Sequence, residues 1–325
     1  MRMGDKVTDS KGRSWAVQAL LGRGLWAKVY LVETGTGTRA VLKCPLEKSD
    51  FKEHGVALAD ACQQASAEQS RLLSGGSQPY LPTLFDTIEL DSGRTALLMP
   101  HLGQSLEKIL MSQPKMDTVL QILCKVAAML TEAKPILHGN LRPSNIFMNE
   151  NGDVILTDVL TVGLHEARGR LEHAHGNRAR FTPPEAEDSP SADWDPWALC
   201  MMTYCSVSST EESRKDSHAS AEQGLTKSAV TILKDNVLSR LKSEDANPRF
   251  LGRAAEEISK LLNRGLSVDA APSPPYRFLT TSELYPRLRS ISDLVHPTVE
   301  AVGHVLLSSV ARDGVFKDGA PPAFS

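Results

Sequence analysis

Cysteine is scarce in this sequence and forms no pattern that builds a site. The five cysteines stand at positions 44, 62, 124, 200 and 205, an odd number without a Cys-x-x-Cys pair. Disulfide-stapled secreted domains and zinc knuckles both need paired or closely spaced cysteines. We therefore expect neither class, and we expect a reducing, cytoplasmic location.

Long apolar runs and a large excess of one charge are also missing. The opening residues 1–10 have no apolar core, which argues against a secretory signal peptide. The most apolar stretches, 118–137 and 197–207, carry polar residues throughout and fall short of the ~20 apolar residues that a membrane helix needs. Lys plus Arg is 36 and Asp plus Glu is 39, a net charge of -3. We therefore expect no membrane and no nucleic acid as a partner.

The apolar residues that are present change their spacing along the chain. The first hundred residues contain short apolar runs between Gly, Thr and Ser turns, which is typical of strands, with one helical stretch near 57–73. Beyond Gly103 helical spacing dominates, as in 118–132, apart from a short hairpin over 145–158. The sequence predicts an α+β fold with a small β-rich N-lobe (1–102), a larger helical C-lobe (103–292) and a tail (293–325). In the tail, a helix would start at Pro297 and the end would be frayed.

Two motifs in the N-lobe indicate a phosphate-binding cleft. Gly22 and Gly24 lie in a turn between two predicted strands, where glycine lets a hairpin backbone approach a phosphate. Lys43 closes an apolar strand further along the chain. Each motif alone is usually just a turn or a solvated edge charge, but their succession favours the cleft.

A third motif, in the C-lobe, decides between these interpretations. The run from His138 to Asn145 reads H-G-N-L-R-P-S-N, and Asp158 begins the triplet D-V-L. These residues resemble the H-R-D-x-K-P-x-N and D-F-G segments of the protein kinase family, in its bacterial Ser/Thr form. Further family positions follow in order over roughly residues 13–292: Glu68 for the helix acid, 99–102 for the gatekeeper and hinge, 183–185 for A-P-E, 195–199 for D-x-W-S-L, and Arg277 for the late arginine.

The resemblance implies a bilobal protein kinase-like fold with ATP and Mg²⁺ as cofactors. Lys43 would hold the α and β phosphates and would itself be held by Glu68, while Asn145 and Asp158 would bind Mg²⁺. Trp26 would cap the phosphates. The nucleotide would contact Gly22, Gly24, Trp26, Val29, Val41, Lys43, Glu68, Pro100, Leu102 and Phe147.

The resemblance also assigns structural and catalytic-loop roles. His138 would fill a packing role, Asp195 would anchor the backbone of the catalytic loop, and Glu185 would pair with Arg277 to tie down the activation segment. Arg142 stands with Asn140 in the catalytic loop, where the family motif has lysine.

Three departures from the family bear on activity. Asn140 replaces the catalytic aspartate, and a neutral amide can orient a hydroxyl group but cannot take its proton. General base catalysis is worth roughly 10²–10⁴-fold in rate. Gly139 replaces the arginine that grips a phosphorylated activation loop, which argues against that switch. Leu160 replaces a glycine and would be strained by ~1–2 kcal/mol if its φ had to be positive.

Two larger side chains stand at the faces that would sandwich adenine. Val41 replaces the usual alanine and Phe147 the usual leucine of the family. Because packed interiors reject even one extra methylene, these side chains would fill part of the purine space. The alternative, that the lobes lie slightly farther apart and ATP still fits, is equally open at this point.

The main hypothesis is a pseudokinase: a kinase-like module that binds another protein, such as an active kinase or its substrate, and retains at most weakened nucleotide binding. One alternative is a slow ATP-dependent protein kinase, because Lys43, Glu68, Asn145 and Asp158 are kept. A less favoured alternative is a small-molecule phosphotransferase, because H-G-N-L with Pro143 and Asn145 is also similar to the loop of aminoglycoside and choline kinases.

Overall fold

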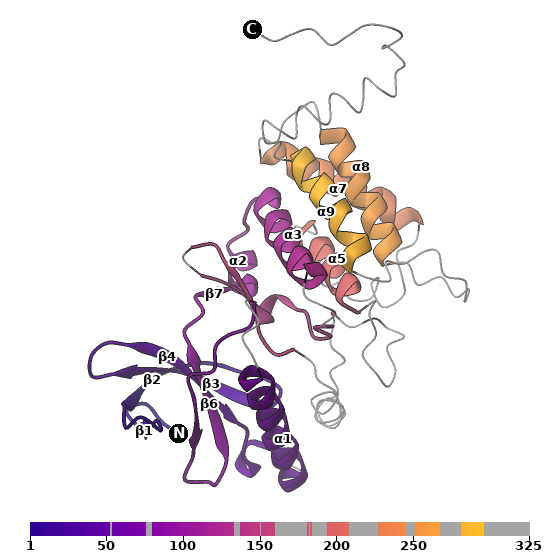
Figure 1. The fold of residues 1–325 in the computed structure, drawn as a ribbon. Coiled ribbons are helices and arrows are strands. Elements are labelled where there is room, and N and C mark those ends of the chain that lie inside the picture. The colour runs from indigo at the N-terminus through magenta and orange to yellow at the C-terminus, as the bar shows by residue number, and fades with distance from the viewer. Residues whose placement is uncertain are drawn as a thin grey trace, which may run out of the picture.

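The N-lobe is a six-stranded antiparallel sheet with one long helix against it (Figure 1). The computed structural model describes residues 1–52, 54–75, 80–132, 137–149, 151–159, 181, 183, 194–207, 227–244, 251–266 and 281–295. The strand order is β1-β2-β3-β4-β6-β5. The elements are β1 (Lys6–Thr8), β2 (Ser14–Arg23), β3 (Ala27–Thr34), β4 (Arg39–Pro45), η1 (Lys48–Asp50), α1 (Gly55–Ser74), β5 (Asp86–Glu89) and β6 (Thr95–Pro100).

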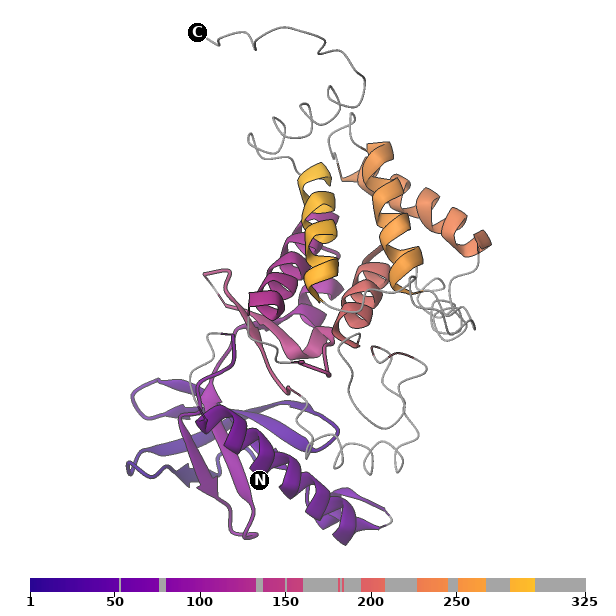
Figure 2. The same ribbon diagram turned by 45° about the vertical axis from the view of Figure 1, so that its right-hand side comes forward.

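The C-lobe carries a small three-stranded sheet, β7-β8-β9, beside a group of helices. Its elements are β7 (Gln104–Ser105), α2 (Leu106–Met111), α3 (Met116–Glu132), η2 (Pro143–Asn145), β8 (Ile146–Met148), β9 (Val154–Leu156), α5 (Trp194–Val207), α7 (Lys227–Ser243), α8 (Leu251–Gly265) and α9 (Thr281–Val295). In both views the sheet lobe lies below the helical lobe, and the chain between β6 and β7 connects them (Figures 1 and 2). The expected α+β architecture, with a small β-rich lobe and a larger helical lobe, is therefore confirmed.

The two faces of the N-lobe sheet have separate apolar cores because side chains alternate along a strand. On β6, Ala96 and Leu98 are in one buried cluster with Trp15 and Leu42, whereas Leu97 and Met99 are in another. The second cluster includes the buried face of α1, which packs on β4 and β6. This alternation places the end of β4, with Lys43, on the face that α1 covers.

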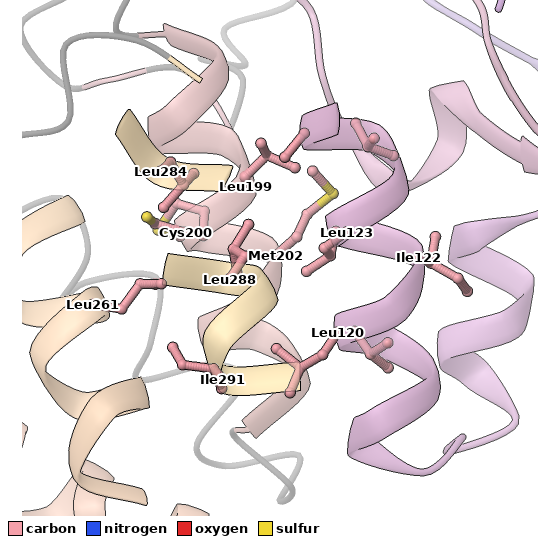
Figure 3. Close-up of a cluster of buried hydrophobic side chains, with 14 of the residues drawn as sticks. Leu120, Ile122, Leu123, Leu199, Cys200, Met202, Leu261, Leu284, Leu288 and Ile291 are labelled. Carbon is pink, nitrogen blue, oxygen red and sulfur yellow. The ribbon is translucent and has the colours of Figure 1, made fainter. Parts of the chain in front are cut away.

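The C-lobe core forms where α3, α5, α8 and α9 meet (Figure 3). Apolar residues recur on α3 at helical spacing, and α3 packs along α9. Side chains at the centre of this core are fully or almost fully buried: Leu120, Leu123, Leu199, Met202, Leu284 and Leu288. The core fixes α3 and α5 beneath the 138–145 loop, and α5 provides that loop's main side-chain anchor.

A glycine makes the connection between the lobes compact. Gly103 has a φ of +85°, and a Cβ at this position would come within 2.5 Å of the backbone oxygen of Met148. A residue with a side chain would be both strained and blocked here. The segment that follows the expected gatekeeper and hinge, 99–102, therefore requires glycine at position 103.

Several parts of the organisation differ from the sequence-based expectation. Strands β1 and β7 and helices α2 and α9 were not predicted, and α9 extends to Val295, past the expected end of the C-lobe at 292. The helix expected from Pro297 lies outside the described residues. All five cysteines are free thiols. None of the described helices combines the length and apolar character that crossing a bilayer demands.

Candidate active-site cleft

Lys43 and Asp158 meet between the lobes. The ammonium group of Lys43, on β4, forms an ion pair with the carboxylate of Asp158, which follows β9. The side chains are only 11% and 22% exposed, so solvent screens this pair less than a surface pair. Two of the predicted phosphate- and metal-binding residues are therefore brought together across a sequence separation of 115.

Trp26 packs its indole ring on the same ammonium group. The Nζ atom of Lys43 lies 4.1 Å from the centre of the ring, a cation–π geometry. Trp26 is 8% exposed and is in the apolar cluster that includes Ala61, Cys62 and Ala65 of α1. Burying a side chain of this size stabilises a fold by roughly 3 kcal/mol. The ring points into the cleft from the tip of the glycine-rich hairpin.

The glycine-rich hairpin uses one of its own backbone donors. The N–H of Gly24 donates to the C=O of Ala27 at 2.8 Å, and Gly22 pairs with Val29 in the β2–β3 register. A second bond, from the N–H of Leu46 to the C=O of Trp26 at 2.9 Å, ties the hairpin tip to the end of β4. The tip backbone is therefore held in place on both sides of the indole.

Glu68 does not form the ion pair that the sequence predicted. Within the described part of the chain, its ion pair is with Arg71 at 3.0 Å, one turn further along α1, and that of Lys43 is with Asp158. The inward face of α1 instead presents Leu58, Ala59, Ala61, Cys62, Ala65, Ser66 and Gln69. The predicted Lys43–Glu68 pair is corrected for this reason: residue 68 lies one helical position away from the buried face.

Gln69 makes the inward contact on that turn of α1. Its side-chain amide donates to the backbone C=O of Val159 at 2.8 Å, in a buried position. Asp158, immediately before, has a φ of +60°, which costs most residues energy and which aspartate tolerates better than most. Leu160, which would be strained if its φ had to be positive, lies outside the described residues. Within them, the strain of the D-V-L segment falls on Asp158.

The side chain of Asn140 is hydrogen-bonded through both its oxygen and its nitrogen. Its Oδ1 accepts a hydrogen bond from Arg142 Nη2 at 2.7 Å, and its Nδ2 donates to the backbone C=O of Asp158 at 2.9 Å. A guanidinium group only donates, so the bond from Arg142 fixes which amide atom faces which partner. The amide is thus a donor toward Asp158, a role that a carboxylate could not fill.

Asp195 and His138 hold the loop from below. The carboxylate of Asp195, on α5, accepts the backbone N–H groups of His138 at 2.7 Å and Gly139 at 2.8 Å. Burial raises the pKa of Asp195 to about 7, against the effect of the two N–H bonds. Burial likewise lowers the pKa of His138 to about 4. The geometry agrees with the expected anchoring and packing roles.

Asn145 and Asp158 have the ligand chemistry that Mg²⁺ prefers. The Nδ2 group of Asn145 donates to the C=O of Asn140 at 2.9 Å, which orients the amide, and Asp158 brings the carboxylate. Among the described residues, no three His, Cys, Asp or Glu side chains group as a metal site. The two residues fit a Mg²⁺ ion that takes its remaining oxygens from phosphates and water.

The chain matches the protein kinase domain family over residues 15–274. The chain belongs to the protein kinase domain family. It is 28% identical to chicken (Gallus gallus) ribosomal protein S6 kinase 2 alpha over 205 residues, which are 58% of this chain and 27% of that protein. The chain therefore spans about a quarter of that curated relative's length.

Two solved kinase structures share the fold. PpkA-294 in its apo form has a TM-score of 0.56 at 14% identity, with 89% of this chain and 99% of that chain covered. The PknI kinase domain of Mycobacterium tuberculosis has a TM-score of 0.54 at 16% identity, with coverage of 90% and 99%. At these identities the likeness speaks for the fold alone.

The residues predicted to enclose adenine lie where the kinase fold brings the lobes together. Val41 on β4 pairs with Met99 on β6, next to the pair of Ala40 and Pro100. Phe147 lies on β8 and is half-buried, as is Val41, while Leu102 is 9% exposed in the hinge. These positions agree with the two walls and the edge of a purine slot, and whether a purine enters stays a prediction. Glu185 and Arg277 lie outside the described residues.

Two features of the kinase cleft region escaped the sequence analysis. Gln69 gave no signal beyond its place on the buried face of α1. A cavity of about 770 Å³ lies in the C-lobe between α2, the 140–144 loop, α5 and α7, and its lining includes Asn140, Arg142 and Arg240. Its lining residues are distant in sequence, so a local pattern cannot reveal it.

Proposed function

We propose that this chain is a pseudokinase: a cytoplasmic kinase-fold module that acts by binding another protein, such as an active kinase or its substrate, rather than by phosphoryl transfer. The observation that carries the proposal is the bonding of Asn140. Its amide donates to the C=O of Asp158 and accepts from Arg142, so the group at the catalytic-base position stabilises the loop. It has no basic atom with which to accept the proton of a substrate hydroxyl group.

The surroundings of Asn140 support a retained scaffold rather than retained chemistry. Asp195 still holds the loop backbone through two N–H bonds, and Asn145 still bonds the loop C=O of Asn140. When bound between Asn145 and Asp158, Mg²⁺ would neutralise phosphate charge. The only carboxylate of that pair, Asp158, is already ion-paired with Lys43. The arrangement therefore favours a stable loop surface over a metal-nucleotide complex.

The test is phosphoryl transfer from γ-labelled ATP, measured for the wild-type chain and for Asn140→Asp. We expect no Lys43-dependent labelling of the chain itself or of an added protein such as casein. Asn151→Asp makes the same chemical change in the exposed turn after β8 and serves as the matched control. Brisk wild-type transfer that Lys43→Ala abolishes, and that Asn140→Asp hardly changes, would overturn the proposal.

A slow ATP-dependent kinase is the second candidate, and the meeting of Lys43 with Asp158 near Asn145 favours it. The two candidates differ in what Mg·ATP does to stability. A ligand that binds only the folded state stabilises it by RT ln(1 + L/Kd), where L is the free ligand concentration, so the melting temperature rises with the logarithm of that concentration once it exceeds Kd. A clear thermal shift at millimolar Mg·ATP together with measurable transfer supports the slow kinase, and no shift counts against it.

A further inference from the structure

Little of the Lys43 ammonium group is left for a phosphate to approach. The indole of Trp26 and the carboxylate of Asp158 contact it at the same time, and the Lys43 side chain is 11% exposed. A phosphate oxygen has to come within about 2.7–2.9 Å of an ammonium nitrogen to form a charge-assisted hydrogen bond. The ring face, 4.1 Å away, lies in the space that such an oxygen and its phosphorus atom would need.

Helix α1 is shaped to receive the indole. Ala61, Cys62 and Ala65 are small and buried, and they belong to the same apolar cluster as Trp26. Their spacing places them on one face of the helix. Glu68 pairs with Arg71 instead of Lys43. On this face of α1 an aromatic ring therefore takes the volume beside the lysine that a long acidic side chain would otherwise fill.

The backbone holds the ring in this position. The C=O of Trp26 accepts from Leu46, and the N–H of Gly24 is used within the hairpin. Across the cleft, Gln69 of α1 bonds the residue that follows Asp158. The N-lobe is thus connected to the D-V-L segment through Lys43 and Gln69, and Trp26 packs on the first of these two residues.

We infer that Trp26 is the residue that excludes nucleotide from this cleft: its indole covers the ammonium group of Lys43 on the side where a phosphate would bind and holds Lys43 in its ion pair with Asp158. The inference rests on the proposed function and deepens it, because it assigns the weakened nucleotide binding to one side chain. A protein partner would then meet the same closed arrangement whatever the concentration of ATP.

Calorimetric titration with Mg·ATP, and with ADP in EDTA, tests this role on the full chain. Trp26→Gly should bind Mg·ATP at least tenfold more tightly than the wild type. Leu21→Ala, at an exposed site on the same hairpin, should bind as the wild type does. Trp26→Phe keeps an apolar ring of smaller size and should give an intermediate gain, which provides a second reading if the glycine variant does not fold.

The outcomes separate this inference from the proposed function. The inference is overturned if Trp26→Gly has a native circular dichroism spectrum and binds Mg·ATP with the same affinity as the wild type. If Trp26→Gly does not fold, the inference is overturned when Trp26→Phe binds Mg·ATP with the same affinity as the wild type. Micromolar binding of Mg·ATP by the wild type also overturns it. None of these results contradicts the pseudokinase proposal, which fails only if the wild-type chain transfers phosphate from γ-labelled ATP. A Trp26→Gly variant that binds ATP without transferring phosphate supports both.

Discussion

Gln69 donates its side-chain amide to the backbone C=O of Val159 at 2.8 Å, across the boundary between the lobes. Gln69 is 3% exposed and Val159 is 2% exposed, so water competes little for either group. The bond lies next to the ion pair of Lys43 and Asp158. It makes the position of α1 depend on the conformation of the segment that follows β9.

Replacing Gln69 with leucine should lower the free energy of unfolding by about 1–3 kcal/mol, because the C=O of Val159 would be left buried and unpaired. Chemical denaturation measures the change. Gln64→Leu makes the same chemical change at an exposed position of the same helix, where water can replace a lost hydrogen bond, and should change stability by less than about 0.5 kcal/mol. Equal effects of the two substitutions would show that the Gln69–Val159 bond contributes nothing.

Two effects require glycine at position 103: the backbone strain of a positive φ, and the close contact that a Cβ would make with the Met148 backbone oxygen. Gly103→Ala adds a Cβ at φ +85° and 2.5 Å from the Met148 oxygen, whereas Gly93→Ala adds one at φ +71° with no atom within 4 Å. The conformational cost of about 1–2 kcal/mol is common to both. We expect Gly103→Ala to lower the melting temperature clearly more than Gly93→Ala, and similar shifts would contradict a close contact at the hinge.

The ion pair of Lys43 and Asp158 should show a coupling free energy of roughly 1–3 kcal/mol in a double-mutant cycle with Lys43→Met and Asp158→Asn. The side chains are largely buried, so raising the salt concentration should reduce the coupling little. The exposed pair of Arg39 and Glu33 is the matched control and should give less than about 1 kcal/mol. A coupling no larger than that of the control would argue against a strong pair in the cleft.

His138 and Asp195 predict two opposing dependences of stability on pH. The lowered pKa of His138, about 4 against 6.5, gives stability that is present at neutral pH and is lost as the pH falls through about 6.5 to 4. The raised pKa of Asp195, about 7 against 3.8, gives stability that is present at low pH and is lost as the pH rises from about 4 to 7. In the wild type the two slopes offset each other between about pH 4 and 6.5.

Replacing either His138 or Asp195 should reveal the pH dependence of stability that the remaining residue causes. For Asp195→Asn, stability should increase with pH over this window by up to about 1.4 kcal/mol per pH unit, and for His138→Leu it should decrease. In addition to this slope, Asp195→Asn should lose about 1–3 kcal/mol of stability, because the amide has one acceptor oxygen where the two oxygens of the Asp195 carboxyl group each accept a buried N–H group. Urea midpoints at pH 4.5, 5.5 and 6.5 measure both slopes, and parallel profiles would rule out the assigned titrations.

The regular part of the fold was predictable from local patterns. The short apolar run in 39–46 and the helical spacing in 118–132 give β4 and α3 close to their observed bounds. Helix α9 escaped because Pro286 lies inside it and reads as a helix breaker. The two-residue β7 and the short α2 have too few residues to show a period.

The sequence predicted which residues enter the cleft, but it did not predict which ion pairs they form there. The motif order predicted that Lys43 and Asp158 meet, as their ion pair shows, because these residues follow fixed strand ends, whereas the metal-binding role of Asn145 stays a prediction. Glu68 was assigned by residue type, whereas the buried face of α1 is set by packing against β4 and β6, which one sequence does not reveal. The inward position of Trp26 depends on the small residues of α1, a match between segments far apart in the chain.

The end of α7 is bonded to the start of α3. Glu244 accepts the N–H of Met116 at 2.6 Å and pairs with Arg240 at 2.8 Å, and Arg240 donates to the C=O of Pro114 at 2.7 Å. Because α3 in turn packs along α9, a displacement of α7 would also displace α3, in the centre of the helical lobe. A protein that binds α7 could therefore shift the helix that packs under the small sheet of the C-lobe.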